Sequence, residues 1–168
     1  MNPGGEGDGS MVIRPMLKAD LARVLEIASA LSHAPHWPTE VYQRALDPTA
    51  LPRRIALVAE GPNLDEVPPG GPLVAGFAVA GVIPPQAEIE TIAVAIEGQR
   101  RGVGRLLLSA ILQELRSLDV TEVLLEARES NHPALGLYSS LGFERTGVRT
   151  RYYADPEEDA VLMALRIL

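Results

Sequence analysis

A glycine-containing segment carries the strongest chemical signal in the sequence. It reads Gln99-Arg100-Arg101-Gly102-Val103-Gly104-Arg105 and lies between an expected strand and an expected helix. The first amides of a helix have no acceptor within the helix and lie at the positive end of its dipole, so they can bind a phosphate. Gly102 and Gly104 lack a Cβ, which lets the backbone approach phosphate oxygens. An ordinary strand-to-helix turn with surface arginines would read the same way, because short Gly-x-Gly matches are common.

This segment matches neither of two common nucleotide-binding motifs. A P-loop ends in Gly-Lys-Ser/Thr, whereas Gly104 is followed by Arg105-Leu106. A Rossmann fingerprint has a third glycine where Leu107 stands, and its strand opens the domain. Both of these interpretations are therefore weakened.

The elements around this segment predict a strand–helix–strand crossover. Strands are expected over 87–95 and 120–127, with a helix over 105–118 between them whose apolar stripe begins at Leu107. Such a connection makes its two strands parallel. Glu88, Glu90, Ile92 and Val94 are expected on one strand face by simple alternation. A helix over 131–141, with Gly142 as its left-handed cap, and strands over 143–153 and 160–168 follow.

The first half of the chain predicts shorter elements. Strands are expected over 11–14, 55–60 and 73–83, and an amphipathic helix over 20–31. A second helix over 40–46 has Thr39 as its expected N-cap. Residues 61–72 are expected to form a loop, and the Gly-rich residues 1–10 a disordered N-terminal tail. One domain over 11–168 is expected, since nothing marks a further boundary.

The composition excludes several classes of function. The 168 residues carry a formal charge of −7, which argues against a nucleic-acid partner, and contain no cysteine. His33, His36 and His132 show no metal-ligand spacing, so no metal is expected. No stretch is long enough to span a bilayer and no signal peptide is visible, so we expect a cytoplasmic protein without a membrane partner. The acidic charge either attracts a basic macromolecular substrate or only favours solubility.

At this point the sequence resembles the GNAT N-acetyltransferases. Their Gln/Arg-x-x-Gly-x-Gly/Ala motif is met by Gln99, Gly102 and Gly104, and the segment 134–143 resembles the family's A-L-x-L-Y-x-x-L-G-F helix. Within the family, residues 91–94, 125–131 and 149–153 are most similar to the ribosomal-protein alanine N-acetyltransferases. The resemblance implies an α/β (α+β) GNAT fold: one mixed, mostly antiparallel sheet of about seven strands, about four flanking helices, and a parallel pair around the crossover helix.

The resemblance also implies roles for individual residues. Glu126 aligns with the general base; alternatively, it is a surface glutamate paired with Arg128. Tyr138 aligns with the acid that protonates the coenzyme thiolate; alternatively, it is a core tyrosine that only packs. Glu88 and Glu90 are reserve bases. The implied acetyl-coenzyme A contacts are Ile92, Ala93, Val94, Arg100, Arg101, Gly102, Val103, Gly104, Arg105, Asn131 and Tyr138. Asn131 serves equally well as an N-cap, and Tyr152 and Tyr153 are candidates to line the substrate channel.

These residues predict acetyl transfer from acetyl-coenzyme A, used as a co-substrate, to the α-amine of a protein N-terminus. The expected acceptor is a small-subunit ribosomal protein with an N-terminal alanine. A lysine side chain or a small-molecule amine is the alternative acceptor. A non-catalytic coenzyme A-binding module is the alternative from another class, and the oligomeric state stays open, with a monomer as one option.

Overall fold

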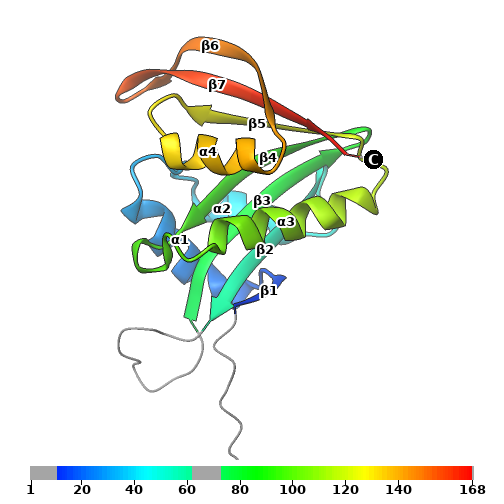
Figure 1. Ribbon diagram of the computed structural model, residues 1–168. Coiled ribbons are helices and arrows are strands. Elements are labelled where there is room, and N and C mark those ends of the chain that lie inside the picture. Colours follow the sequence, from blue (N-terminus) through cyan, green and yellow to red (C-terminus); the bar gives the residue numbers. More distant parts are fainter. Residues whose placement is uncertain (1–10, 62–72, 168) are drawn as a thin grey trace, which may run out of the picture.

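The computed structural model describes residues 11–61 and 73–167 (Figure 1). The predicted tail over residues 1–10, almost all of the predicted loop over 61–72, and Leu168 lie outside these ranges. Those predictions, and the domain boundary at residue 11, stay predictions.

One sheet of seven strands forms the centre of the described chain, in the order β1-β2-β3-β4-β5-β7-β6. Among these described strands, β4 and β5 are the only parallel pair, and the other neighbours are antiparallel. The predicted fold class and the parallel crossover are therefore confirmed. The strands are β1 (Val12–Pro15), β2 (Arg53–Gly61), β3 (Leu73–Ile83), β4 (Gln86–Val94), β5 (Glu122–Arg128), β6 (Glu144–Ala154) and β7 (Glu157–Arg166).

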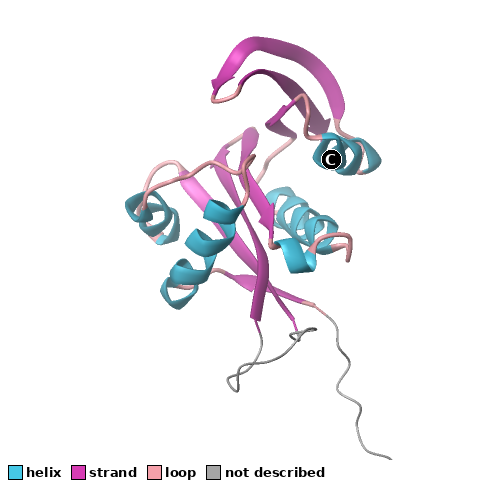
Figure 2. Cartoon of the chain, turned by 90° about the vertical axis from the view of Figure 1, so that its left-hand side faces the viewer, coloured by secondary structure: helices cyan, strands magenta, loops and turns pink. Residues whose placement is uncertain are grey.

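Helices cover both faces of this sheet (Figures 1 and 2). The helices α1 (Leu21–Ala30) and α2 (Thr39–Leu46) build one apolar core with the sheet, and Tyr42, Phe77 and Val79 belong to it. On the opposite face, α3 (Val103–Arg116) and α4 (His132–Ser140) build the other. The predicted stripe of α3 is fully buried there, since its five members are at most 4% exposed: Leu107, Leu108, Ile111, Leu112 and Leu115.

Several element ends differ from the sequence prediction. The helix α3 begins at Val103, two residues early, because the Gly102 carbonyl already accepts the N–H of Leu106 at 3.0 Å. Thr39 is the first residue of α2 rather than its N-cap, which is Pro38. The strand β7 starts at Glu157, so residues expected in an acidic turn pair with β6 instead.

A bulge in β4 corrects the predicted strand faces. Val79 of β3 pairs with Thr91 and the next residue, Ala80, pairs with Ile89, which leaves Glu90 without a partner. Because the extra residue reverses the alternation, Ile92 packs against the α3 core, whereas Ala93 lies in the α1–α2 core. Simple alternation predicted that the glutamates of β4 share a face with Ile92 and Val94. That prediction is wrong, because the bulge places them on opposite faces.

Candidate active site

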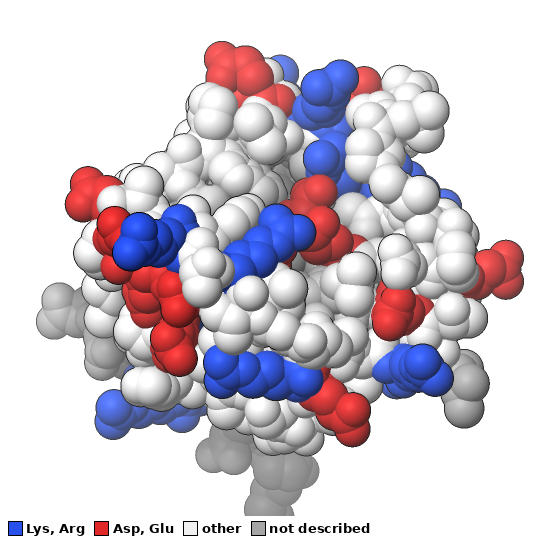
Figure 3. Space-filling view, turned by 90° about the horizontal axis from the view of Figure 1, so that it is seen from above, with Lys and Arg blue, Asp and Glu red and all other residues white. Residues whose placement is uncertain are grey.

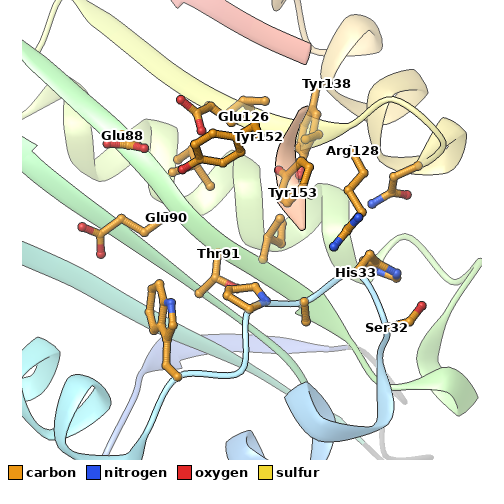
Figure 4. A pocket seen from close by; sticks show the side chains of 18 of the residues that line it. Ser32, His33, Glu88, Glu90, Thr91, Glu126, Arg128, Tyr138, Tyr152 and Tyr153 are labelled. Carbon is orange, nitrogen blue, oxygen red and sulfur yellow. The ribbon is translucent and has the colours of Figure 1, made fainter. Parts of the chain in front are cut away.

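A gap between β4 and β5 creates the candidate site. The parallel pairing of the two strands ends at Ile89 with Leu125, although β4 continues to Val94 and β5 to Arg128. A cavity of about 570 Å³ lies where the strands separate. Its wall is completed by the α1–α2 connection, by α4 and by Tyr152 and Tyr153 of β6 (Figure 4).

The separated edge of β4 carries free backbone groups. Ala95 donates its N–H to the Ala75 carbonyl at 2.8 Å, which fixes the hydrogen-bonding phase of the β3–β4 ladder. Since that phase alternates along an antiparallel pair, Ala93 faces β3, and the amides of Ile92 and Val94 face the gap. The Gln99 side chain confirms this direction, because it donates to the Val94 carbonyl at 3.2 Å.

The glycine-containing turn lies at the end of this edge. Gly102 is the N-cap of α3, with a φ of 76° and no capping side chain, so the amides of Val103, Gly104 and Arg105 have no acceptor within the helix. A Cβ on Gly104 would lie 3.2 Å from Leu137 of α4 and 3.8 Å from Val94, so this glycine allows α3, α4 and β4 to approach closely. Arg100 is exposed and has a φ of 64°, a costly conformation for a non-glycine residue that is concentrated at functional sites.

The arginines of the turn differ in their contacts. Arg101 is exposed, like Arg100. Arg105 donates to the Ser140 hydroxyl at 2.6 Å, which links the start of α3 to the end of α4. Positive charge and unpaired amides thus meet at one point, with no acidic residue in the first turn of α3. This arrangement suits a phosphate-bearing ligand.

Glu126 lies on the cavity wall at the point where β5 leaves β4. Its neighbours Leu125 and Ala127 are buried on the other face, as strand alternation predicts. Its carboxylate lies 3.4 Å from Nε of Arg149 of β6. Arg128, the partner considered from the sequence, instead pairs with Glu158 at 3.3 Å.

Tyr138 projects from α4 into the core side of the same cavity. It is 5% exposed and packs against Phe143, with ring centroids 5.9 Å apart. Burial, helped by neighbouring Tyr153, raises the pKa of Tyr138 to about 12, so its phenol stays protonated and can donate a hydrogen bond at neutral pH. The Asn131 side chain caps α4 by accepting a hydrogen bond from the N–H of Ala134 at 3.4 Å. Asn131 also lines the cavity, so its two predicted roles, N-cap and coenzyme contact, are compatible.

Three carboxylates face the cavity from β4 and β5: Glu88, Glu90 and Glu126 (Figure 4). Glu90 pairs with Arg54 of β2 at 2.8 Å. Glu88 has no cation within ion-pair distance among the described residues. Burial first, and then the charges of Glu126 and Glu90, raise the pKa of Glu88 above its ordinary value. Both carboxylates considered as reserve bases thus line the cavity.

Several site residues were missed by the sequence analysis. Thr91 is 5% exposed and its hydroxyl has no hydrogen-bond partner in the described chain, although it lines the cavity. His33 lies in the α1–α2 connection and also lines the cavity. Burial lowers the pKa of His33, and the charge of Arg128 lowers it further. The guanidinium of Arg128 lies over the Tyr153 ring, 4.2 Å from its centroid. No short motif marks these residues, because their roles depend on the bulge and on strand pairing.

The structure therefore groups the predicted residues into two neighbouring sets. Ile92, Glu126, Asn131 and Tyr138 line the cavity, whereas Ala93, Val94 and residues 100–105 do not. Residues 100–102 form the turn before α3, and residues 103–105 begin the helix. Within residues 11–61 and 73–167, no cluster of three or more acidic or histidine side chains is arranged to hold a metal ion. Basic and acidic side chains are interspersed on the face around β6 and β7 (Figure 3).

The model of the Acetyltransferase (GNAT) family matches residues 24–143, which include β4, the glycine-containing turn, α3, β5 and α4. The chain belongs to the GNAT family.

Individual relatives agree with this assignment. The N-alpha-acetyltransferase RimI of Mycobacterium tuberculosis is 36% identical over 157 residues, which cover 91% of this chain and 90% of that protein. The [ribosomal protein bS18]-alanine N-acetyltransferase of Salmonella typhimurium is 44% identical over 96 residues, but the match spans 56% of this chain and only 65% of that enzyme. The crystal structure of the Escherichia coli ribosomal-protein-S18-alanine N-acetyltransferase superimposes with a TM-score of 0.76 at 30% identity, covering 94% of both chains.

No helix in the described part of this GNAT protein is both long and apolar enough to cross a membrane.

Proposed function

We propose that this protein transfers the acetyl group of acetyl-coenzyme A to the α-amine of a protein N-terminus. The expected acceptor is an N-terminal alanine of a small-subunit ribosomal protein, as the names of its relatives suggest. One observation carries the proposal: the gap between β4 and β5 lies between a helix start with unpaired amides and a cavity that holds a carboxylate and a phenol.

The residues around the gap fit acetyl-coenzyme A. The amides of Val103, Gly104 and Arg105 would bind the diphosphate, and a Cβ at Gly104 would already crowd Leu137. The free amide edge of Ile92 and Val94 would pair with the extended pantetheine portion, as a neighbouring strand would. An amide at this edge would also stabilise negative charge on the carbonyl oxygen under attack. Ala93 lies between these two residues and pairs with β3, so it would hold their amides in position.

Glu126 would accept the proton that the amine loses. A free α-amine has a pKa of about 7.7–8.0, so a modest base is sufficient, whereas a lysine amine near 10.4 needs more help. The new N–C bond forms as the C–S bond breaks, and the proton passes to the Glu126 carboxylate directly or through water. The contact with Arg149 would hold this carboxylate towards the cavity.

Tyr138 would assist the departing sulfur. An ordinary thiol has a pKa of about 8.5, well below the value of about 12 for Tyr138. A complete proton transfer to the thiolate is thus uphill, so the phenol would act first as a hydrogen-bond donor. The proton that it gives up would be returned from solvent or from the base.

Acetyl-coenzyme A and a peptide that begins with alanine and contains one internal lysine test the proposal. We expect a mass gain of one acetyl group, located on the α-nitrogen by fragmentation, and one free thiol released per peptide. The matched control is the same peptide with a blocked N-terminus, which should not react. Acetylation of the lysine in both peptides would favour the alternative acceptor, and coenzyme binding without any transfer would favour a binding module.

A further inference from the structure

The cavity wall formed by β4 carries polar side chains that have no role in the proposed acetyl transfer. The bulge in β4 places Glu88, Glu90 and Thr91 on the face that carries α1 and α2. The proposed base and acid, Glu126 and Tyr138, already account for both proton transfers. The roles of the Glu88 carboxylate and the Thr91 hydroxyl are therefore open.

The charges on this wall are not balanced. Arg54 lies 2.8 Å from Glu90 and Arg149 lies 3.4 Å from Glu126, whereas Glu88 has no such partner in the described ranges. Glu88 is an exposed residue, yet partial burial of its carboxylate and the charges of Glu126 and Glu90, offset in part by Arg149, raise its pKa. A cation beside Glu88 would counter the repulsion between these carboxylates. A cationic ligand group fits this position.

Thr91 gives an independent sign of a ligand. Its side chain is on the cavity wall (Figure 4) and its hydroxyl, in a residue only 5% exposed, has no partner among the described residues. A buried hydroxyl without a hydrogen-bond partner destabilises the fold. A hydrogen-bonding group of a bound molecule would remove this destabilisation.

The shape of the surface shows where such a molecule would continue. A second hollow of about 180 Å³ shares Glu88 and Glu90 with the main cavity. Its other lining residues include Pro52, Ile83 and Leu124, and Ile83 is 67% exposed. An apolar floor beside a free carboxylate suits a lysine or arginine side chain, whose stem is apolar and whose end is charged.

The spacing agrees with a polypeptide. Glu88 pairs with Leu124, and Glu126 follows two residues later on the same face of β5. Strand geometry then separates the Cα atoms of Glu88 and Glu126 by about 8 Å or slightly more. An extended peptide advances about 3.3–3.6 Å per residue. A basic side chain within the first few residues can thus reach Glu88 while the terminal amine lies at Glu126.

We propose that Glu88 and Thr91 form a subsite for the acceptor polypeptide, in which Thr91 hydrogen-bonds to its backbone and Glu88 pairs with a lysine or arginine side chain close to its N-terminus. This inference rests on the proposed function for the position of the terminal amine. It makes Glu88 a residue that determines specificity rather than a base.

Peptide binding and turnover measured separately test the subsite. The probes are alanine-initiated peptides, fluorescently labelled at the C-terminus, that differ only in lysine or norleucine at one of positions two to four. Fluorescence anisotropy gives the affinity in the presence of coenzyme A, and thiol release with acetyl-coenzyme A gives kcat and KM. We expect one lysine position to improve affinity and kcat/KM by roughly 10-fold to 100-fold, the range for a hydrogen-bonded charge pair.

The variant Glu88→Gln should remove most of this preference, and the preference of the wild type should weaken as salt is added. Glu114→Gln is the matched control, because it removes the same charge from an exposed position of α3. A lysine preference that is equal in Glu88→Gln and the wild type would overturn the inference. So would an equal loss of kcat on both peptides, because that result indicates a base.

Thr91→Val tests the second half of the subsite. The substitution keeps the branched shape but removes the hydroxyl, so we expect higher thermal stability together with about 5-fold to 30-fold weaker binding of both peptides. Unchanged binding would exclude a hydrogen bond to the acceptor. The two proposals fail separately: lysine-dependent binding without acetyl transfer disproves only the function, and α-amine transfer without lysine preference disproves only the subsite.

Discussion

Nε of Arg149 lies 3.4 Å from the Glu126 carboxylate, although their strands are not neighbours in the sheet. The strand β7 separates β5 from β6, so the arginine reaches across it towards the cavity. Arg149 is 57% exposed and Glu126 19% exposed at the side chain, so this contact contributes little to stability. We expect the contact to orient one carboxylate in the site.

The first prediction concerns that carboxylate. Glu126→Gln should lower kcat by about 10²-fold to 10⁴-fold, the usual contribution of a positioned base. The deficit should shrink as the pH rises towards 8, because more of the α-amine is then unprotonated. Arg149→Gln should cost no more than about 10-fold, since it removes orientation but leaves the base in place. Thiol-release kinetics from pH 6 to 9 measure these effects.

Glu129→Gln serves as the matched control for this series. Glu129 is exposed and its nearest cation, Arg145, is 4.0 Å away. The control should retain the kinetics of the wild type. A Glu126→Gln enzyme with normal turnover at pH 6 would show that another group accepts the proton.

The second prediction concerns the buried phenol of Tyr138. Tyr138→Phe should lower kcat by about 10-fold to 10³-fold while coenzyme affinity changes little. Because burial raises the pKa of Tyr138 to about 12, the wild type should not lose activity between pH 8 and 10 through ionisation of this phenol. Steady-state kinetics and coenzyme titrations separate the two quantities.

Tyr42→Phe is the matched control, since Tyr42 is also buried and its pKa is likewise raised to about 12 by burial. Its hydroxyl has no partner in the described chain and lies outside the cavity lining. We expect unchanged kcat and equal or higher stability. Equal losses of kcat in both variants would mean that packing, not proton donation, explains the effect.

The sequence predicted the elements that periodicity controls. The α3 stripe from Leu107 to Leu115 and the left-handed Gly142, with a φ of 97°, both follow from local physical rules. The bulge at Glu90 could not be predicted from the sequence. More buried and less buried residues keep alternating along β4 through the bulge, so the pattern looks like that of a regular strand. The sequence analysis also missed Thr91 and the Arg54–Glu90 pair, 36 residues apart, because long-range pairing decides their surroundings.

The third prediction compares two glycines of the turn that we propose binds the coenzyme. Gly102 has a φ of 76° and open space where a Cβ would lie. In Gly102→Ala the free turn can relax away from this costly φ, so restoring it for the coenzyme should weaken binding by about 1 kcal/mol, or roughly fivefold. A Cβ at Gly104 would lie 3.2 Å from Leu137. Gly104→Val should therefore displace the first turn of α3, whose amides we propose bind the diphosphate, and weaken coenzyme binding by at least about tenfold. Isothermal titration with coenzyme A measures both.

Gly136→Ala is the control for these substitutions. Gly136 lies within α4 and nothing approaches its Cβ position within 4 Å. An alanine there should leave binding unchanged and raise the free energy of unfolding by about 0.5–1 kcal/mol. If Gly104→Val binds coenzyme A like the wild type, the diphosphate lies elsewhere.

The fourth prediction concerns stability and pH at the start of α1. Asp20 is 8% exposed; it accepts two hydrogen bonds from Arg14, both at 2.8 Å, and one from Leu17 N–H at 2.7 Å. The bonds from Arg14, opposed by burial and aided by Leu17, hold the pKa of Asp20 below its ordinary value of 3.8. A lowered pKa means that ionised Asp20 stabilises the fold above pH 3.8, and that this contribution is lost as the pH falls through the lowered value.

Asp20→Asn should therefore reduce the free energy of unfolding by about 2 kcal/mol at pH 7. The difference from the wild type should stay constant between pH 6 and 8 and shrink below pH 4, where the wild-type carboxylate also becomes protonated. Urea unfolding at several pH values measures it, and Asp155→Asn, an exposed site in the β6–β7 turn, provides the control. A difference that persists unchanged at pH 2.5 would show that shape, not charge, makes Asp20 stabilising.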